Sequence, residues 1–329
     1  MSISIKTARE IEKMRRAGEL LEKVHDELGR AIHPGMSTWE INKLGEEMIR
    51  SFGCTPNFLN YNGYPASICV SVNEEVVHGI PSKKRILKEG DIVSLDAGLI
   101  YEGYHSDAAR THAVGEISPE ARKLVEVTRQ AFFEGIKYAK AGHHLHEISA
   151  AIGAYAESFG YGVVRDLVGH GIGTHLHEDP AVPNFAQPSR GVRLQPGMTL
   201  AIEPMITAGG YAVRWLDDDW TVVTEDGSLA AHYENTILIT EGEPEILTPI
   251  VKGMFARSLA GHDKGRLYVI SDVQEPYVFL VDGKIRTANR PKKKKLIHVQ
   301  PDYEMTDAVR DEDIRKALKE KSCKELKED

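Results

Sequence analysis

The sequence predicts an α+β protein whose first 248 residues form two similar halves, followed by a small β-rich module. Three observations support this prediction. A pattern of helix and strand repeats at a constant offset of 107 residues, each half carries the apolar periodicities of helices and strands, and charge and strand spacing both change near residue 249.

The internal repeat joins a helical segment and a more distant strand segment in each half. Residues 33–53 resemble residues 140–160, and at the same offset a Gly-led turn and an apolar strand end in a carboxylate, Asp96 in one half and Glu203 in the other. The alternative is chance similarity between two amphipathic helices, but one offset serves both a helix and a strand. We therefore predict pseudo-twofold halves whose strands converge on a central cleft.

The elements of each half follow from periodicity. Apolar residues recur near every 3.6 positions in four segments, whereas short runs rich in β-branched residues occupy three others. We expect helices over residues 7–30, 38–52, 119–140 and 145–159, and strands over residues 67–72, 91–100 and 199–208.

Composition excludes several classes of protein. The N-terminus mixes charges into every turn, so no secretory signal is expected, and no apolar run approaches the ~20 residues that span a bilayer. The three cysteines lack CxxC spacing, which argues against a disulfide framework or a zinc ribbon. We expect a soluble, cytoplasmic, monomeric protein without a membrane partner; its cysteines are Cys54, Cys69 and Cys323.

Two aspartates flank a predicted hairpin turn. Within residues 91–114, Asp96 and Asp107 are symmetric about the midpoint between Tyr101 and Glu102, which would place them directly opposite each other. Directly opposed side chains have Cβ atoms ~4.5–5.5 Å apart, and like charges there are destabilising unless a cation lies between them. Two solvated aspartates are the alternative, and a slip of one residue in the turn would separate them.

Three further residues complete a candidate ligand set. His170 lies between two glycines that leave its imidazole accessible, and Glu203 and Glu234 lie in or after apolar strands where an unpaired carboxylate is costly. The alternatives are that His170 has a purely structural role and that each glutamate is neutralised in an ordinary ion pair. Together with Asp96 and Asp107, these residues suit two divalent ions of Mn, Fe, Co or Zn.

Six motifs resemble the signature set of type I methionine aminopeptidases of the short bacterial form, over residues 1–248. They are VHGIP at 77–81, SLDAG at 94–98, HSDAARTH at 105–112, GHGIGTHLHEDP at 169–180, AIEPM at 201–205 and AHYENTI at 231–237. The resemblance implies the duplicated creatinase-like "pita-bread" fold and removal of the initiator methionine from nascent polypeptides. It also implies metal ligation by Asp96, Asp107, His170, Glu203 and Glu234.

The resemblance further implies roles around the metals. Glu203 also manages the proton of the attacking water, and His78 and His177 bind the scissile amide and stabilise the tetrahedral intermediate. The methionine side chain would lie among Phe58, Tyr61, Tyr64, Cys69, Leu176 and Trp220.

Departures from the family pattern fall in this pocket and beside the last ligand. Position 58 is Phe where Cys is frequent, and position 176 is Leu where Phe is frequent. The resemblance therefore does not fix the volume of the pocket. Asn235 replaces a frequent His next to Glu234 and would tune the metal without removing it.

The chain changes character after residue 248. Residues 249–299 carry 11 basic and 4 acidic residues, against 23 and 35 in residues 1–248. Short alternating segments between Gly-rich turns over residues 249–301 predict a small SH3-like barrel and resemble KOW-type RNA-binding modules. Residues 302–329 read as a charged helical or mobile tail with little apolar surface. We expect the lysine run to contact the phosphates of ribosomal RNA through Lys292, Lys293, Lys294 and Lys295. The alternative is that these lysines are simply solvated.

Two other functions compete with this hypothesis. An Xaa-Pro aminopeptidase or prolidase would use a similar ligand set, although such enzymes generally carry a large domain before the catalytic half, for which a helix beginning near Thr7 leaves no room. A metal-free binding protein on the same fold, with the basic module as its working part, is the second alternative. The filled ligand positions argue against it.

Overall fold

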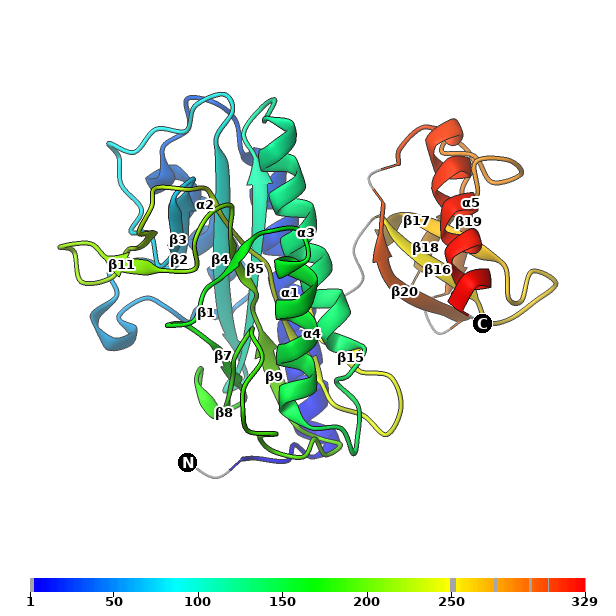
Figure 1. The fold of residues 1–329 in the computed structure, drawn as a ribbon, viewed down its shortest axis with the longest axis horizontal. Helices are drawn as coiled ribbons and strands as arrows, with labels where there is room; N and C mark the ends of the chain where they lie inside the picture. The colour runs from blue at the N-terminus through cyan, green and yellow to red at the C-terminus, as the bar shows by residue number, and fades with distance from the viewer. Residues whose placement is uncertain (1–2, 249–252, 275–276, 296–297, 307, 329) are drawn as a thin grey trace. The chain divides into compact units, whose positions relative to one another are not determined.

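The computed structural model describes residues 3–248, 253–274, 277–295, 298–306 and 308–328, and the chain divides into two compact units, Met1–Pro249 and Ile250–Asp329 (Figure 1). This division agrees with the change in composition after residue 248. Among the described helices, none is both long and apolar enough to cross a bilayer.

Four helices of the first unit lie close to their predicted positions. Reciprocal capping boxes at Thr7/Glu10 and Ser37/Glu40 start two of them, the His144 amide donates to the Glu147 carboxylate at the start of another, and the Ser118 side chain caps the remaining one, so local sequence fixes each N-terminus. The third helix ends at residue 136, four residues before the predicted end. The helices are α1 (Ala8–Ala31), α2 (Thr38–Ser51), α3 (Pro119–Ile136) and α4 (Leu145–Glu157).

A nine-stranded sheet forms the centre of the first unit. Its main order is β1-β4-β5-β14-β9-β7-β8, with β2 on β4 and β15 on β14. The bounds are β1 (Thr55–Pro56), β2 (Ile68–Val72), β4 (Ile92–Tyr101), β5 (Tyr104–Ala113), β7 (Gly169–Gly171), β8 (Glu178–Val182), β9 (Thr199–Ile202), β14 (Glu234–Leu238) and β15 (Glu245–Ile246).

Two three-stranded sheets accompany the large one. Their orders are β13-β10-β6 and β11-β12-β3. The predicted strand over residues 199–208 is divided into β9 and β10 at Glu203–Pro204, where the proline lacks a backbone donor. The bounds are β3 (Glu75–Val77), β6 (Gly162–Val163), β10 (Met205–Thr207), β11 (Val213–Trp215), β12 (Val222–Thr224) and β13 (Ala230–His232), with a short 3-10 turn η1 (Tyr61–Gly63).

The structure confirms the internal repeat in detail. Gly35 and Gly142 both have left-handed backbones, with φ of 92° and 88°, and their amides donate to the carbonyls of Leu87 and Leu194, each pair 107 residues apart. Isolated bridges between residues 37 and 86 and between 144 and 193 repeat at the same offset. Each half therefore ties the start of its helix to the turn before its central strand.

Helix α1 covers one face of the central hairpin. Its buried residues pack with those of β4 in one apolar cluster, and α1 lies alongside β4 and β5 (Figure 1). The ring of His25 on α1 hydrogen-bonds the carbonyl of Ala108 across this contact, at 2.8 Å. Because side chains alternate along a strand, every second residue of β4 and β5 points away from α1.

The second unit is a five-stranded antiparallel sheet of order β19-β18-β17-β16-β20, followed by one helix. Strand β20 continues to residue 305, beyond the predicted module end at residue 301. The elements are β16 (Met254–Ser258), β17 (Leu267–Gln274), β18 (Tyr277–Val281), β19 (Lys292–Lys295), β20 (Val299–Met305) and α5 (Asp311–Glu328).

The expectation of little apolar surface on the last helix was wrong. Ile314 of α5 is 1% exposed and packs with Phe255, Val269 and Val281 of the sheet, and Leu318, one turn later, joins the same cluster. The spacing of four residues puts both side chains on one face of a helix, where a few apolar residues among many charges suffice to dock it.

Candidate metal centre

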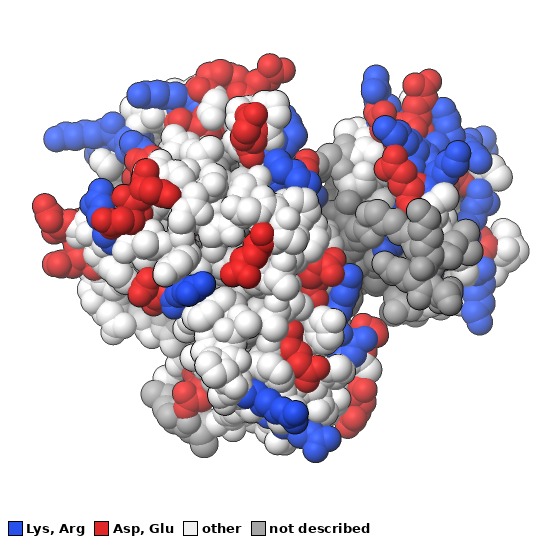
Figure 2. Space-filling model, in the orientation of Figure 1, with Lys and Arg blue, Asp and Glu red and all other residues white. Residues whose placement is uncertain are grey.

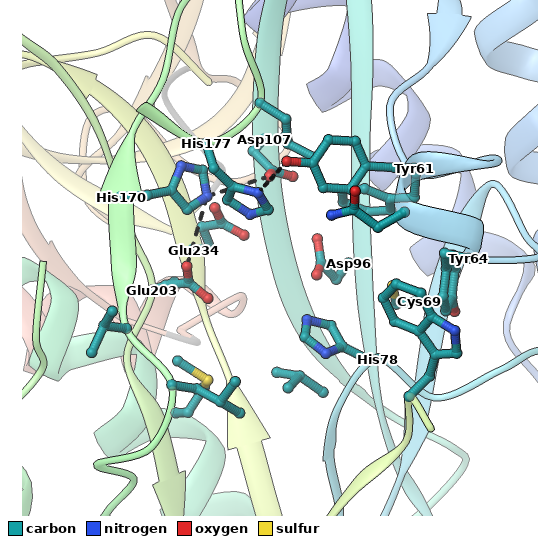
Figure 3. Close-up of a pocket in the computed structure, with 18 residues that line it drawn as sticks. Tyr61, Tyr64, Cys69, His78, Asp96, Asp107, His170, His177, Glu203 and Glu234 are labelled. Atoms are coloured by element: carbon teal, nitrogen blue, oxygen red, sulfur yellow. Dashed lines mark hydrogen bonds and ion pairs between the residues drawn. The ribbon is translucent and has the colours of Figure 1, made fainter. Parts of the chain in front are cut away.

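Five adjacent strands of the large sheet each bring one predicted ligand to the same region. In spatial order, Asp96 lies on β4, Asp107 on β5, Glu234 on β14, Glu203 directly after β9 and His170 on β7. Their side chains converge on one pocket (Figure 3). Ligands from both halves of the repeat therefore meet where the two halves of the sheet join.

The register of the central hairpin differs from the prediction. Asp96 pairs with Ala109 and Asp107 pairs with Gly98, so the two aspartates are diagonal neighbours and not directly opposite. The cause is a two-residue turn at residues 102–103, both with positive φ, which moves the hairpin midpoint by one residue. Because the pairing shifts by two residues, both carboxylates stay on one face.

His170 is oriented as a ligand. Its Nδ1 donates to the carbonyl of Gly171 at 2.8 Å, which leaves the lone pair on Nε2, 3.9 Å from Asp107 Oδ2 and 3.9 Å from Glu203 Oε1. Ligand atoms of Asp107, His170 and Glu234 lie within 4.8 Å of one another. Ligand bonds of about 2.0–2.2 Å allow one cation to contact atoms separated in this way.

Three of the four carboxylates have a buried oxygen without a hydrogen-bond partner in the described part of the chain. Among the described residues, Asp96 Oδ1, Asp107 Oδ1 and Glu234 Oε1 are buried without a hydrogen-bond partner. Burial raises the pKa of Asp96, Asp107, Glu203 and Glu234, and repulsion from neighbouring carboxylates raises that of Asp107 and Glu234 further. The donor set therefore fits a bound divalent cation, whose charge would make this proximity favourable.

One residue at this centre was missed by sequence reasoning. His232 lies on β13, is 1% exposed, and places Nε2 3.5 Å from Glu203 Oε2. Ligand atoms of Glu203, His232 and Glu234 form a second group within 4.8 Å of one another. Burial lowers the pKa of His232 to about 4. The available signal was its position two residues before Glu234 in the AHYENTI motif.

The pocket joins the metal centre to an apolar recess. Its cavity is about 210 Å³. The residues expected to bind substrate all line it: Phe58, Tyr61, Tyr64, Cys69, His78, Leu176, His177 and Trp220. Five lining residues were not anticipated from the sequence: Asn62, Val77, Leu167, Val168 and Met205.

The apolar recess lies directly beside one candidate ligand. Cys69 on β2 is the cross-strand partner of Asp96 (Figure 3). The rings of Tyr64 and Trp220 pack edge to face, with centroids 5.1 Å apart. The Tyr64 hydroxyl donates to a backbone carbonyl, that of Gly79, at 2.9 Å. With the Tyr64 hydroxyl satisfied by this hydrogen bond, the Tyr64 ring presents mainly apolar surface to the recess.

Two histidines lie on different sides of the carboxylates in Figure 3. His78 has a left-handed backbone, with φ of 59°, and burial lowers its pKa to about 4. His177 shares a 2.7 Å hydrogen bond between Nδ1 and the Tyr61 hydroxyl, and its ring centroid is 4.3 Å from that of His170. A non-glycine residue held in the left-handed region is frequent at functional sites.

The opposite face of the sheet carries a buried ionic network. Arg110 donates to the carbonyl of Glu234, to Glu22 at 3.1 Å and to Asn235 Oδ1 at 2.7 Å. Asn235 Oδ1 also accepts from Thr248 at 2.8 Å. The Asn235 side chain therefore points away from the carboxylates, so any influence on a metal acts through the backbone of Glu234.

The lysine run divides between the two faces of β19. Lys292 and Lys294 form ion pairs with Asp263 at 2.6 and 3.0 Å, and Lys294 is buried. Lys293 and Lys295 are exposed. Alternation along the strand explains this division, and it removes two of the four lysines from the surface that a nucleic acid could contact.

A cleft lined by buried carboxylates with unpartnered oxygens and by an oriented imidazole, beside a recess for a side chain, is typical of a metal-dependent hydrolase. Comparison with known proteins specifies the family: residues 12–241 match metallopeptidase family M24, and the chain belongs to it. A methionine aminopeptidase of Clostridium acetobutylicum is 56% identical over 246 residues, which cover 75% of this chain and 98% of the relative.

Solved structures agree with this assignment. A methionine aminopeptidase of Thermotoga maritima is 48% identical with a TM-score of 0.74, covering 76% of this chain and 100% of that one. An Xaa-Pro dipeptidase of Bacillus anthracis shares the fold at 28% identity and a TM-score of 0.62, covering 75% of this chain and 62% of that one. The duplicated pita-bread fold is thereby confirmed for the first unit.

Proposed function

We propose that this enzyme removes the N-terminal methionine from nascent proteins, using two divalent cations held by Asp96, Asp107, His170, Glu203 and Glu234. The observation that carries the proposal is the apolar recess placed one cross-strand pair away from a candidate ligand, Cys69 opposite Asp96. The names of the relatives at 56% and 48% identity support the choice of methionine. Co, Mn, Fe and Zn all suit these ligands.

Bound cations would supply Lewis acidity, which lowers the pKa of a water and polarises the scissile carbonyl. The chain's own residues position the substrate and exclude water from it. A bound cation would also hold a free α-amino group through its lone pair, while Tyr64 and Trp220 enclose the first side chain. A substrate with a blocked N-terminus loses the first of these interactions, so the site is that of an aminopeptidase and not an endopeptidase.

Three residues are proposed to act on the reacting groups. His78 and His177 line the pocket together with the carboxylates and would donate hydrogen bonds to the scissile amide as charge develops on its oxygen. Glu203, whose pKa is raised by burial, would accept the proton of the attacking water and return it to the leaving amine.

The activity is tested with peptides that differ only in their first two residues, after reconstitution of metal-free protein with each of the four ions. Release of methionine from Met-Ala-Ser, with little cleavage of Leu-Ala-Ser or N-acetyl-Met-Ala-Ser, is the expected result. Preferential cleavage of Xaa-Pro dipeptides would assign the chain to the prolidase type. A purified protein that binds no divalent ion would favour a metal-free binding role.

We further propose that the second unit is an SH3-like, KOW-type module that tethers the enzyme to ribosomal RNA. The supporting observation is a basic and aromatic face on β18 and β19: Lys293 lies over the ring of Tyr277 at 4.2 Å, and Phe279 and Lys295 point to the same side. Basic side chains are prominent on the visible surface of this unit (Figure 2). Lysine beside aromatic rings suits phosphates and unstacked bases.

The tether predicts ribosome cosedimentation that weakens with salt and disappears when residues 250–329 are deleted. Charge reversal of the two exposed lysines, K293E/K295E, should reduce the association, whereas K264E, on an exposed lysine that lies outside β18 and β19, should reduce it less. Salt-insensitive binding, or equal effects of the two changes, would contradict the tether through this face.

A further inference from the structure

His232 is a buried imidazole without an assigned task. Only 1% of its surface is exposed, and within the described residues neither ring nitrogen has a hydrogen-bond partner. An unpaired N–H is costly to bury, so this imidazole is expected to gain a partner when the site is filled.

The backbone of His232 is clamped from two sides. Its amide donates to Thr111 Oγ1 at 2.9 Å, its carbonyl accepts from the same hydroxyl at 2.9 Å, and it pairs with Met205 of β10. Thr111 in turn shares a 2.8 Å hydrogen bond with Ser94 of β4. These contacts tie the position of the imidazole to the hairpin that carries Asp96 and Asp107.

The imidazole of His232 lies near one carboxylate oxygen of Glu203, and that of His170 lies near the other. Nε2 of His232 lies 3.5 Å from Oε2, whereas Nε2 of His170 lies 3.9 Å from Oε1, so the two carboxylate oxygens have different neighbours. The Glu203 backbone is held by Asn184, whose amide donates to the Glu203 carbonyl at 3.0 Å. Because the backbone of Glu203 is held in this way, the orientation of its carboxylate depends on its side-chain torsions.

We infer that His232 is a positioning residue whose ring N–H holds Oε2 of Glu203, so that Oε1 stays directed to the metals and the attacking water. The inference rests on the proposed function. The 3.5 Å separation is longer than a hydrogen bond, but catalytic hydrogen bonds are often long before the site is occupied and tighten in the complex. Partners of this kind fix the orientation of a ligand and typically change activity 10- to 100-fold.

The test compares two substitutions of His232 in the full-length, metal-loaded enzyme. H232Q keeps an N–H donor of similar reach, whereas H232M removes the donor at similar volume. We expect kcat for a Met-Ala-Ser peptide to fall about 10- to 100-fold in H232M with a smaller change in KM, and to be restored to within about threefold by H232Q. H112M, on a partly buried histidine on the opposite face of β5, is the matched control and should keep kcat.

Spectroscopy separates positioning from ligation. Metal content per chain, and the single coordinated imidazole nitrogen seen by pulsed EPR of the Co-loaded enzyme, should be the same in the wild type and both variants. Loss of a nitrogen signal in H232M would make His232 a ligand and overturn the inference, and so would an H232Q enzyme as slow as H232M. A wild type that releases no methionine would refute the proposed function instead.

A measurement on the wild type covers the case in which H232M does not fold. In Zn-loaded protein labelled with ¹⁵N-histidine, the ring N–H of His232 should give a protected, downfield-shifted resonance that is lost in Glu203→Ala. A His232 resonance that exchanges freely with solvent, or that is unchanged in Glu203→Ala, would contradict the hydrogen bond.

Discussion

Arg110→Met is expected to destabilise the first unit by about 3–5 kcal/mol without changing its fold, because it leaves a buried carboxylate unpaired. The Glu22 and Arg110 side chains are 12% and 10% exposed and lie 3.1 Å apart, so water does not replace the lost partner. The Glu234 carbonyl and Asn235 lose donors as well. Against a total stability of about 5–15 kcal/mol, this loss is large.

Tryptophan fluorescence isolates the unit concerned. All three tryptophans, Trp39, Trp215 and Trp220, belong to the first unit, so urea unfolding followed by their emission reports that unit in the full-length chain. The midpoint should fall while the m-value stays constant, and Tm should drop by roughly 6–20 °C. R110K, which keeps the charge but not the planar fork, should lie between the wild type and R110M.

A double variant tests the cause. If an unpaired carboxylate is responsible, Glu22→Gln in the Arg110→Met background should recover about 1–3 kcal/mol, since neutral Gln is less costly to bury than a lone charge. A loss below about 1 kcal/mol in R110M, or no recovery in the double variant, would refute the assignment of a tightly coupled buried pair.

Three further outcomes follow from the same geometry. Asp107→Asn should reduce bound metal per chain by elemental analysis, since its carboxylate lies in the cluster with His170; retention of full metal would count against that ligand. In metal-free protein, burial raises the pKa of Asp96 to about 7 and of Glu203 to about 8, so the folded state holds protons that the unfolded state has released. Its free energy of unfolding should therefore fall from about pH 4 to about pH 8, level off above that, and be restored by divalent ions; a metal-free protein whose stability rises over that range would contradict the shifts. His78→Ala should lower kcat while metal content stays full, and release of metal without a separate catalytic defect would show that its role is wrong.

Local signals in the sequence were sufficient for the elements and for the composition of the site. Capping boxes start their helices within one turn because they act through hydrogen bonds between residues three apart. The repeat located Asp96 and Glu203 as counterparts because one backbone geometry, including left-handed glycines, recurs at one offset. The pocket residues all meet in one cavity, as the motifs implied.

Tertiary structure decided whatever depends on register and on which face a side chain occupies. The turn at residues 102–103 set the Asp96 and Asp107 pairing, because both turn residues adopt positive φ, a choice that apolar alternation does not determine. The hydrogen bond from Arg110 directed the Asn235 side chain away from the carboxylate cluster, and Asp263 drew Lys292 and Lys294 out of the exposed lysine run. 

His232 shows the same limit at the site itself. Its place beside Glu203 arises from the pairing of β13 with β10 and from contacts with Thr111, a residue 121 positions earlier in the chain. The sequence by itself therefore determined the helices, the duplication and the donor atoms, since these follow from neighbouring residues and from repetition. Only folding decided which donors face one another, because that depends on pairing between strands far apart in the chain.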